Sequence, residues 1–303
     1  MITRTLQRLV RAVPSSDGAG VRLLRSLGQP LGPRQAIRVD PFLLLDEFSS
    51  ENPDDYVAGF PAHPHRGFET ITYILDGHML HEDHLGHRGD LRSGGVQWMT
   101  AGRGIVHSEM PQQTQGRMRG FQLWLNLPAR EKMRDPEYVD LQPETIPEVQ
   151  LPGGGRVRII AGSFDPGSGP IRGPIGGRST EPVYFDVRLA AGGRFEHSLP
   201  EGHNAFVYPY EGRVRVGPVE TAKPVEAHVA GVLSERGRVL VHADNEAEGS
   251  EAAASPSEAC FLLIAGRPIG EPIAQYGPFV MNTADEIQQA LLDFQSGELQ
   301  RAR

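Results

Sequence analysis

The chain has 303 residues, a formal net charge of −8 and one cysteine, Cys260. A single thiol excludes an intrachain disulfide and a zinc ribbon or iron–sulfur cluster built from cysteines. The negative charge disfavours direct binding to nucleic acids. No stretch approaches the roughly 18 uninterrupted apolar residues of a membrane span. Because the first residues lack the pattern of a secretory signal, we expect a cytoplasmic location.

Two regions of alternating apolar residues predict β-strands, and 36 Gly and 25 Pro residues indicate many tight turns between them. The first region runs from Val21 to Leu127 and includes Phe68–Leu75, a predicted strand that is apolar on both faces. The second region runs from Val183 to Ile264. The Gly-, Pro- and Ser-rich stretch 162–177 lies between them and is typical of a linker.

The last part of the chain contains a predicted helix. Thr283-Ala284-Asp285-Glu286 forms a capping box, and apolar residues then recur on one helical face up to Phe294. Before it, the acidic stretch 246–258 predicts a solvated loop. Cys260 follows that loop beside an apolar run, so we expect it to be buried.

A weak internal repeat relates the two strand-rich regions. Tyr73–Gly77 is similar to Tyr208–Gly212, and Phe121–Trp124 is similar to Phe261–Ile264 at nearly the same separation along the chain. A β-barrel duplicated in tandem produces this pattern. We therefore predict an all-β protein of two domains, residues 1–145 and residues 146–303.

The sharpest local feature is His63-Pro64-His65. Proline favours extended backbone before it, and residues i and i+2 of a strand point to the same face, so the two imidazoles can hold one metal ion. His107-Ser108-Glu109 repeats this geometry with a carboxylate. Three imidazoles and one carboxylate suit Fe(II), Mn(II), Ni(II), Cu(II) or Zn(II).

Other histidines do not form such a pattern. Four recur at every third residue: His78, His81, His84 and His87. On a strand this spacing places successive side chains on opposite faces, so we expect them to be mainly solvated, with a second, weak metal site as the alternative. Pro200 and Gly202 interrupt any strand between His197 and His203, so we expect both histidines at the surface.

In the segments around His63-Pro64-His65 and His107-Ser108-Glu109, the chain resembles the pirin family of the cupin superfamily. Four blocks carry the resemblance, which spans about residues 21–282: the lead-in segment Asp40–Glu47, the first cupin motif Gly59–Gly77, the second motif Gln97–Glu109 and the C-terminal signature Gln275–Asn282.

The resemblance implies two jelly-roll cupin barrels, with a metal in the N-terminal one. It assigns the ligands to four side chains: His63, His65, His107 and Glu109. The general cupin motif also admits Glu69 as the carboxylate, but the pirin pattern favours Glu109 and leaves Glu69 beside the ligands. At the offset that relates Tyr73 to Tyr208, His63 falls on Ser198 and His65 on Pro200, so we expect the C-terminal barrel to be metal-free. The same offset places His242 on His107 and Asp244 on Glu109. We interpret this match as a coincidence, because the other two ligand positions are lost.

The resemblance further implies a quercetin 2,3-dioxygenase, which opens a flavonol ring with O2 and releases CO. Fe(II) is the favoured metal, while Mn, Ni, Cu and Zn also fit the ligands. Glu109 is the candidate acceptor of the substrate hydroxyl proton. The candidate walls of the substrate pocket, for which core packing is the alternative role, are Phe60, Trp98, Phe121 and Trp124.

A second hypothesis stays open. Members of the family are also linked to regulation through protein partners, with the metal as a structural or redox-sensing element. The ligand set fits that role without a substrate, and the negative charge disfavours DNA but not a protein partner.

Overall fold

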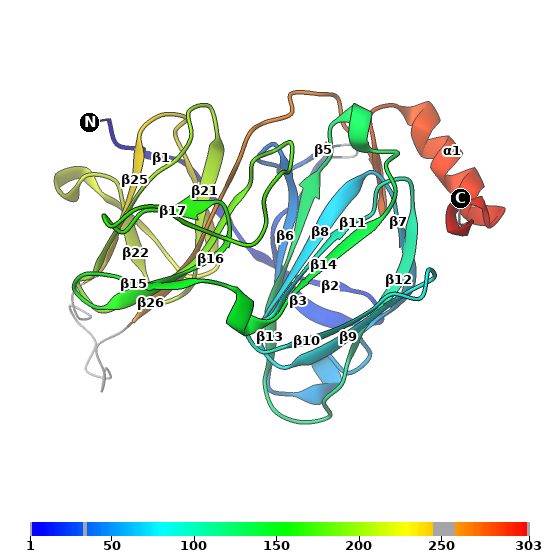
Figure 1. Cartoon of the computed structure of the whole chain (residues 1–303), viewed down its shortest axis with the longest axis horizontal. Coiled ribbons are helices and arrows are strands. Elements are labelled where there is room, and N and C mark those ends of the chain that lie inside the picture. The colour runs from blue at the N-terminus through cyan, green and yellow to red at the C-terminus, as the bar shows by residue number, and fades with distance from the viewer. Residues whose placement is uncertain (1, 33–34, 245–257, 302–303) are drawn as a thin grey trace. The chain divides into compact units, whose positions relative to one another are not determined.

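The computed structural model describes residues 2–32, 35–244 and 258–301, which form two compact units (Figure 1). The N-terminal barrel comprises residues 13–143 and 269–303, and the C-terminal barrel comprises residues 1–12 and 144–268. Each is built from one seven-stranded and one four-stranded antiparallel sheet. The all-β prediction is confirmed.

The N-terminal barrel has a long sheet in the order β14-β11-β8-β13-β6-β3-β2 and a short sheet in the order β10-β9-β12-β7. The long sheet consists of β2 (Val13–Asp17), β3 (Val21–Leu27), β6 (Phe42–Ser50), β8 (Phe68–Asp76), β11 (Val96–Thr100), β13 (Met118–Asn126) and β14 (Glu137–Leu141). The short sheet consists of β7 (Phe60–His65), β9 (His78–Asp83), β10 (Arg88–Arg92) and β12 (Ile105–Pro111). Strand β8 is buried from Phe68 to Ile74, as its two apolar faces predict.

Smaller elements complete this barrel: the hairpins β4 (Pro30–Gly32) with β5 (Gln35–Ala36) and β27 (Ala274–Tyr276) with β28 (Phe279–Met281), and the helix α1 (Ala284–Gln295). The predicted capping box is present, because the Thr283 side chain accepts from the backbone of Glu286 and the Glu286 side chain accepts from the backbone of Thr283.

The C-terminal barrel repeats this plan. Its long sheet has the order β1-β24-β21-β26-β19-β16-β15 and consists of β1 (Leu6–Arg11), β15 (Glu148–Gln150), β16 (Gly155–Ala161), β19 (Val183–Leu189), β21 (Asn204–Glu211), β24 (Val229–Leu233) and β26 (Ala259–Gly266). Its short sheet has the order β20-β25-β22-β23 and consists of β20 (Arg194–Ser198), β22 (Val214–Val216), β23 (Lys223–Val225) and β25 (Arg238–Ala243).

The two strand orders explain the weak repeat. Strands β8 and β21 hold equivalent places in their sheets, as do β13 and β26, and these are the strands whose sequences match. The first strand in the two orders comes from different parts of the chain. In the N-terminal barrel it is β14, which follows the other strands of that sheet in the sequence. In the C-terminal barrel it is β1, which lies at the start of the chain.

The compact units differ from the predicted domains, 1–145 and 146–303, at both chain ends. Residues 1–12 pair within the C-terminal barrel, and residues 269–303 pack in the N-terminal one. The division between residues 143 and 144 lies close to the predicted position. The stretch 162–177 is not the linker between the units, since it lies within the C-terminal barrel and contains β17 (Ser163–Phe164) and β18 (Ile171–Arg172).

Cys260 is fully buried in β26, as predicted. The predicted acidic loop, residues 246–258, lies outside the described residues except for its last one. None of the helices in the described parts of the chain has the length and apolar character needed to cross a membrane.

Candidate metal centre

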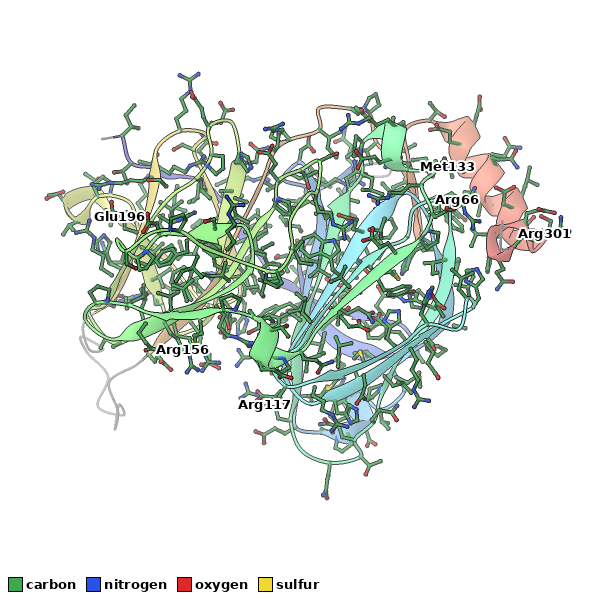
Figure 2. All side chains as sticks on the ribbon, viewed as in Figure 1. Arg66, Arg117, Met133, Arg156, Glu196 and Arg301 are labelled. Carbon is green, nitrogen blue, oxygen red and sulfur yellow. The ribbon has the colours of Figure 1, made fainter. Side chains whose placement is uncertain are left out.

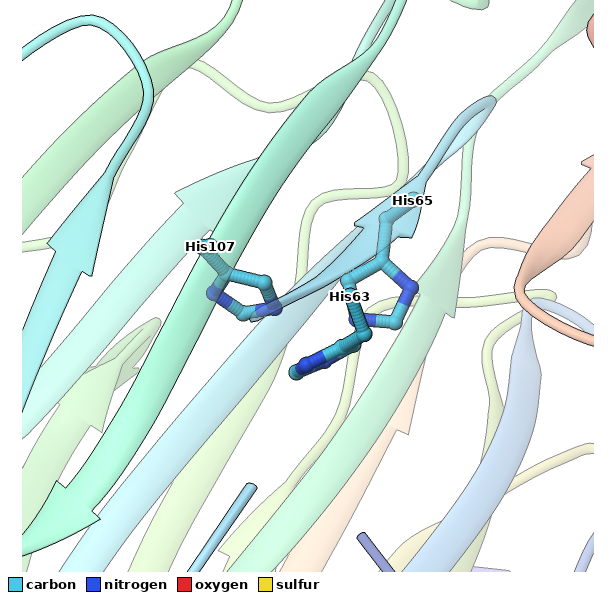
Figure 3. A group of neighbouring side chains, drawn as sticks. All are labelled: His63, His65 and His107. Atoms are coloured by element: carbon cyan, nitrogen blue, oxygen red, sulfur yellow. The ribbon is translucent and has the colours of Figure 1, made fainter. Parts of the chain in front are cut away.

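Three histidines converge inside the N-terminal barrel (Figure 3). His63 and His65 extend from β7, and His107 extends from the neighbouring strand β12, directly paired with His63. One nitrogen of each ring lies within 4.8 Å of the other two. The ring centroids of His63 and His107 are 4.3 Å apart, and His65 lies 4.7 and 4.8 Å from these two rings. The predicted meeting of the two motifs is therefore seen in the structure.

The histidine environment favours neutral rings with available lone pairs. Burial and the neighbouring charge of His63 lower the pKa of His65 well below its ordinary value, and burial does the same to the pKa of His107. His65 Nδ1 and His107 Nε2 are buried without a hydrogen-bond partner among the described residues. Buried polar atoms are seldom left unpaired. Neutral imidazole nitrogens are common ligands of transition metals, so these side chains fit a metal ion.

The other ring nitrogens fix how the imidazoles are held. His63 Nδ1 donates to the carbonyl of Pro61 at 2.8 Å, which leaves Nε2 for a ligand. His107 Nδ1 lies 2.5 Å from Nε2 of His81, a hydrogen bond between two imidazoles. A metal-bound histidine usually donates its second N–H to such a partner, which sets its tautomer and orientation.

His81 is therefore part of the centre, and the expectation that it is solvated is wrong. It is 3% exposed, and its ring centroid lies 4.4 Å from that of His107. The alternation of apolar Met79 with His81 is the sequence signal that places His81 on the buried face of the strand, because residues i and i+2 share a face. The other three histidines of that group are less buried.

Glu109 lies beside the histidines but not among the three grouped nitrogens. It is 3% exposed, accepts a 2.9 Å hydrogen bond from Thr72 Oγ1, and lies 3.7 Å from His81 Nδ1. Burial raises the pKa of Glu109, but His81, His63 and Thr72 together outweigh burial and hold that pKa below its usual value. The pairing of β12 with β7 has a register shift whose extra residue lies on β7, so Glu109 is paired with Phe60. Strand β12 itself pairs regularly with β9, and His107 and Glu109 keep the same strand face. Glu109 as fourth ligand stays a prediction.

Glu69 is directed away from this centre. It pairs with Thr100, whose hydroxyl donates to it at 2.7 Å, whereas its strand neighbours Thr70 and Thr72 point to the other face. His65 and Glu69 lie on different strands, because the chain turns at Gly67 from the short sheet into the long sheet. Their even spacing in the sequence therefore does not place the two side chains on one face.

A cavity of about 1240 Å³ opens beside the histidines and is lined by His63, His65 and Glu109. Two of the predicted aromatic walls, Phe60 and Trp124, also line it. Trp98 and Phe121 do not line this cavity and are buried in the core, the alternative role named for these aromatic residues. Trp98 pairs with Ile71 and Phe121 with Tyr73, on the face of the long sheet opposite to Thr72 and Trp124.

The C-terminal segment supports the strand end that carries His65. Arg66, labelled in Figure 2, donates from its backbone to Pro278, accepts from the backbone of Val280, and forms a 2.7 Å ion pair with Asp293 of α1. Buried Lys132 donates to the carbonyl oxygens of Gly67 and Val280 at 2.7 and 3.0 Å.

The corresponding interior of the C-terminal barrel is apolar. Its equivalent strands β20 and β25 direct two pairs inward, Phe195 with Val241 and His197 with Val239. Phe195, Val239 and Val241 carry no atom that could bind a metal, and the absence of a metal from this barrel stays a prediction. His242 alternates with the core valines and faces outward, in agreement with its treatment as a coincidence.

The surface prediction for His197 and His203 is wrong. His203 is 1% exposed, and its ring nitrogen lies 3.0 Å from the carbonyl of Glu181. His197 is half-buried, with its ring centroid 5.0 Å from that of Phe185, and burial lowers the pKa of His197 to about 4.

Comparisons with known proteins agree with this arrangement. The family model described as pirin matches residues 20–125, and the one described as the pirin C-terminal cupin domain matches residues 184–300. These matches confirm the predicted fold of two cupin domains.

Individual relatives match over nearly the whole chain. A Pseudomonas aeruginosa protein, whose name proposes a quercetin 2,3-dioxygenase, is 52% identical over 94% of both chains. Human pirin is 42% identical over 93% of this chain and 89% of its own. The crystal structure of quercetin 2,3-dioxygenase from Acinetobacter baumannii superposes with a TM-score of 0.84 at 30% identity, covering 98% of this chain and 99% of that one. The chain belongs to the pirin family.

Proposed function

We propose that the N-terminal barrel binds one divalent transition metal and catalyses the opening of a flavonol ring by O2 with release of CO. The observation that carries the proposal is the wall of the cavity, where His63 and His65 lie beside Glu109 and the indole of Trp124. A cavity with a few convergent polar groups and an aromatic wall suits a planar aromatic ligand. The names of the Pseudomonas and Acinetobacter proteins support this choice of substrate.

The metal would be held by His63, His65 and His107, with Glu109 as the proposed fourth ligand and Fe(II) as the proposed ion. When bound, it supplies a Lewis acid that lowers the pKa of the substrate hydroxyl. Glu109 accepts that proton. Thr72 donates to Glu109 Oε1, so the second carboxylate oxygen is available to the substrate.

Trp124 orients the substrate. Its ring centroid lies 5.4 Å from that of His65 and 4.4 Å from that of Phe68, so the indole is fixed next to the metal position. An aromatic ring held against this wall has its hydroxyl directed to the histidines. The apolar wall also limits the access of water to the reacting ring.

The test uses the purified protein loaded separately with Fe(II), Mn(II), Ni(II), Cu(II) or Zn(II). Quercetin is added under oxygen while flavonol absorbance and CO are followed. We expect turnover with at least one metal, loss of metal and turnover in His63→Ala, and loss of turnover in Glu109→Ala. The control His242→Ala, in the other barrel, should retain both. Tight metal binding without turnover of quercetin by any metal form would reject the enzyme and favour the regulatory hypothesis.

A further inference from the structure

A row of polar side chains crosses the long sheet of the N-terminal barrel at a single register. Each member is paired directly with the next across neighbouring strands, so all share one face of the sheet. In order from β14 to β3 the members of this polar row are Asp140, Gln97, Thr72, Gln122, Asp46 and Arg25. Asp140 at the end of the row is exposed, whereas Gln97, Thr72 and Asp46 are buried. Polar side chains are unexpected at buried positions of a barrel, which apolar residues usually occupy.

Hydrogen bonds connect neighbouring members. Gln97 donates to Asp140 at 2.8 Å, Thr72 Oγ1 lies 2.6 Å from Gln122 Oε1, and Arg25 donates twice to Asp46, at 2.8 and 2.7 Å. The row also reaches the metal centre, because Thr72 donates to Glu109.

Only part of the row faces the cavity. Gln122, Asp46 and Arg25 line the cavity that contains His63 and Glu109, whereas Gln97, Thr72 and Asp140 do not line it. Asp46 lies two strands away from Thr72. With strands about 4.8 Å apart, Asp46 is on the order of 10 Å from Thr72, across the cavity wall.

The donors and acceptors of Thr72, Glu109 and Gln122 determine which hydrogen bonds this wall can form with a ligand. Thr72 has one hydroxyl proton, and the ionised Glu109 can only accept, so the proton goes to Glu109. Since one proton cannot serve both acceptors, we orient the Gln122 amide so that Nε2–H takes the place of Oε1 and donates to Thr72. This orientation leaves the amide oxygen of Gln122 as an acceptor for a ligand.

Asp46 has unused acceptor capacity as well. It is 4% exposed, and its two oxygens each accept one hydrogen bond from Arg25, whereas a carboxylate offers about four acceptor positions. Burial raises the pKa of Asp46 to about 6 despite the opposing effect of Arg25, as expected of a carboxylate with too few donors.

We infer that Asp46 and Gln122 form a specificity subsite that accepts hydrogen bonds from hydroxyl groups on the end of an aromatic substrate remote from the three histidines. The inference rests on the proposed function, which places the reacting ring at the histidines. Arg25 is a positioning residue, because its two-pronged contact fixes the plane of the Asp46 carboxylate. The ligand class is thus an aromatic molecule with neighbouring hydroxyl groups at its distal ring.

The test compares two flavonols with the same reacting ring. Quercetin carries two neighbouring hydroxyl groups on its pendant ring, and galangin carries none. Dissociation constants are measured without oxygen, on metal-loaded protein, from quenching of tryptophan fluorescence, and KM and kcat are measured separately under oxygen. Binding is therefore observed independently of turnover.

The variants are Gln122→Met, Asp46→Asn and the matched control Gln97→Met, which changes the same residue type in the same row outside the cavity. Losing a hydrogen bond to a buried acceptor weakens binding by about tenfold. We expect Gln122→Met and Asp46→Asn to weaken quercetin binding by about tenfold, while galangin binding stays within about twofold of its original value. Gln97→Met should leave the preference for quercetin over galangin intact.

The outcomes separate this inference from the proposed function. Equal weakening of both flavonols, or no binding of either by the unaltered protein, would overturn the subsite. Loss of the quercetin preference in both cavity variants, with no turnover by any metal form, would support the subsite and reject the dioxygenase. Turnover by the unaltered protein, with the preference for quercetin over galangin unchanged in both cavity variants, would support the dioxygenase and reject the subsite.

Discussion

A single imidazole, His81, joins the two parts of the metal centre. It lies 2.5 Å from His107 Nδ1 on one side and 3.7 Å from Glu109 on the other. Since His107 Nε2 is the unpartnered nitrogen, His107 Nδ1–H donates to His81 and the lone pair is directed at the metal position. His81 therefore orients a ligand without belonging to the group of three.

We predict that His81→Leu lowers the affinity for Fe(II) or Zn(II) by about 10- to 100-fold, the usual cost of losing such a partner. His81→Gln restores an acceptor for His107 and should lose less. Competition with a chelator of known affinity measures both. His78→Asn, on the same strand but at the barrel surface, is the control. Equal affinities in His81→Leu and His78→Asn would contradict the orienting role.

At the scale of elements, strand β28 packs directly behind the turn that follows His65. A Cβ atom on Gly67 would lie 2.0 Å from the carbonyl oxygen of Val280, so only glycine allows this approach. The Lys132 ammonium donates to the carbonyl oxygens of both Gly67 and Val280, and burial lowers the pKa of Lys132 to about 8. The contact joins the end of the strand that carries His63 and His65 to a segment far along the chain, next to Phe279.

Gly67 and Gly86 provide a matched pair to test this contact. Their φ angles are +88° and +87°, but a Cβ on Gly86 would meet nothing within 4 Å. Gly86→Ala should cost about 1 kcal/mol from backbone strain alone, and Gly67→Ala about 2 kcal/mol more, with loss of metal occupancy. Urea unfolding followed by tryptophan fluorescence reports on this barrel, because both tryptophans, Trp98 and Trp124, lie in it. Similar costs for the two variants would reject the role of β28.

At the scale of the whole molecule, two barrels with the same strand order have opposite interiors. One places three imidazoles at the equivalent positions where the other has Phe195, Val241 and a single histidine, His197. That remaining imidazole lies against phenyl rings without the partner rings that a metal would require. The same architecture therefore holds a group of histidines in the N-terminal barrel and an apolar core in the C-terminal barrel.

The half-buried His197 should make the C-terminal barrel sensitive to acid. Its folded pKa of about 4 lies below the ordinary value of 6.5, so the unfolded chain binds the proton more tightly. The stability it contributes is fully present above pH 6.5 and falls by about 3 kcal/mol as the pH approaches 4. Urea unfolding followed by circular dichroism at pH 7 and pH 4.5 should show a smaller pH dependence in His197→Leu than in the unaltered protein. An unchanged pH dependence would contradict this assignment.

The sequence predicts local alternation well and tertiary direction poorly. The side-by-side placement of His63 and His65 depends only on strand geometry, and it is observed. The position of Glu109 relative to these histidines depends on a bulge, and the direction of Glu69 depends on the change of sheet at Gly67. No local sequence pattern reveals either feature. The sequence left two roles open for Trp98 because an aromatic residue in a strand buried on both faces does not show which face it occupies.

The exchange of chain ends has a consequence for biosynthesis. Domains generally fold from the N-terminus while the ribosome is still extending the chain. Here the walls of the cavity include Ile273 to Pro278, which lie in the N-terminal barrel although they are translated after the C-terminal one. The binding chamber is therefore closed among the last events of synthesis, and a nascent chain halted at residue 268 would carry all three histidines without a finished pocket around them.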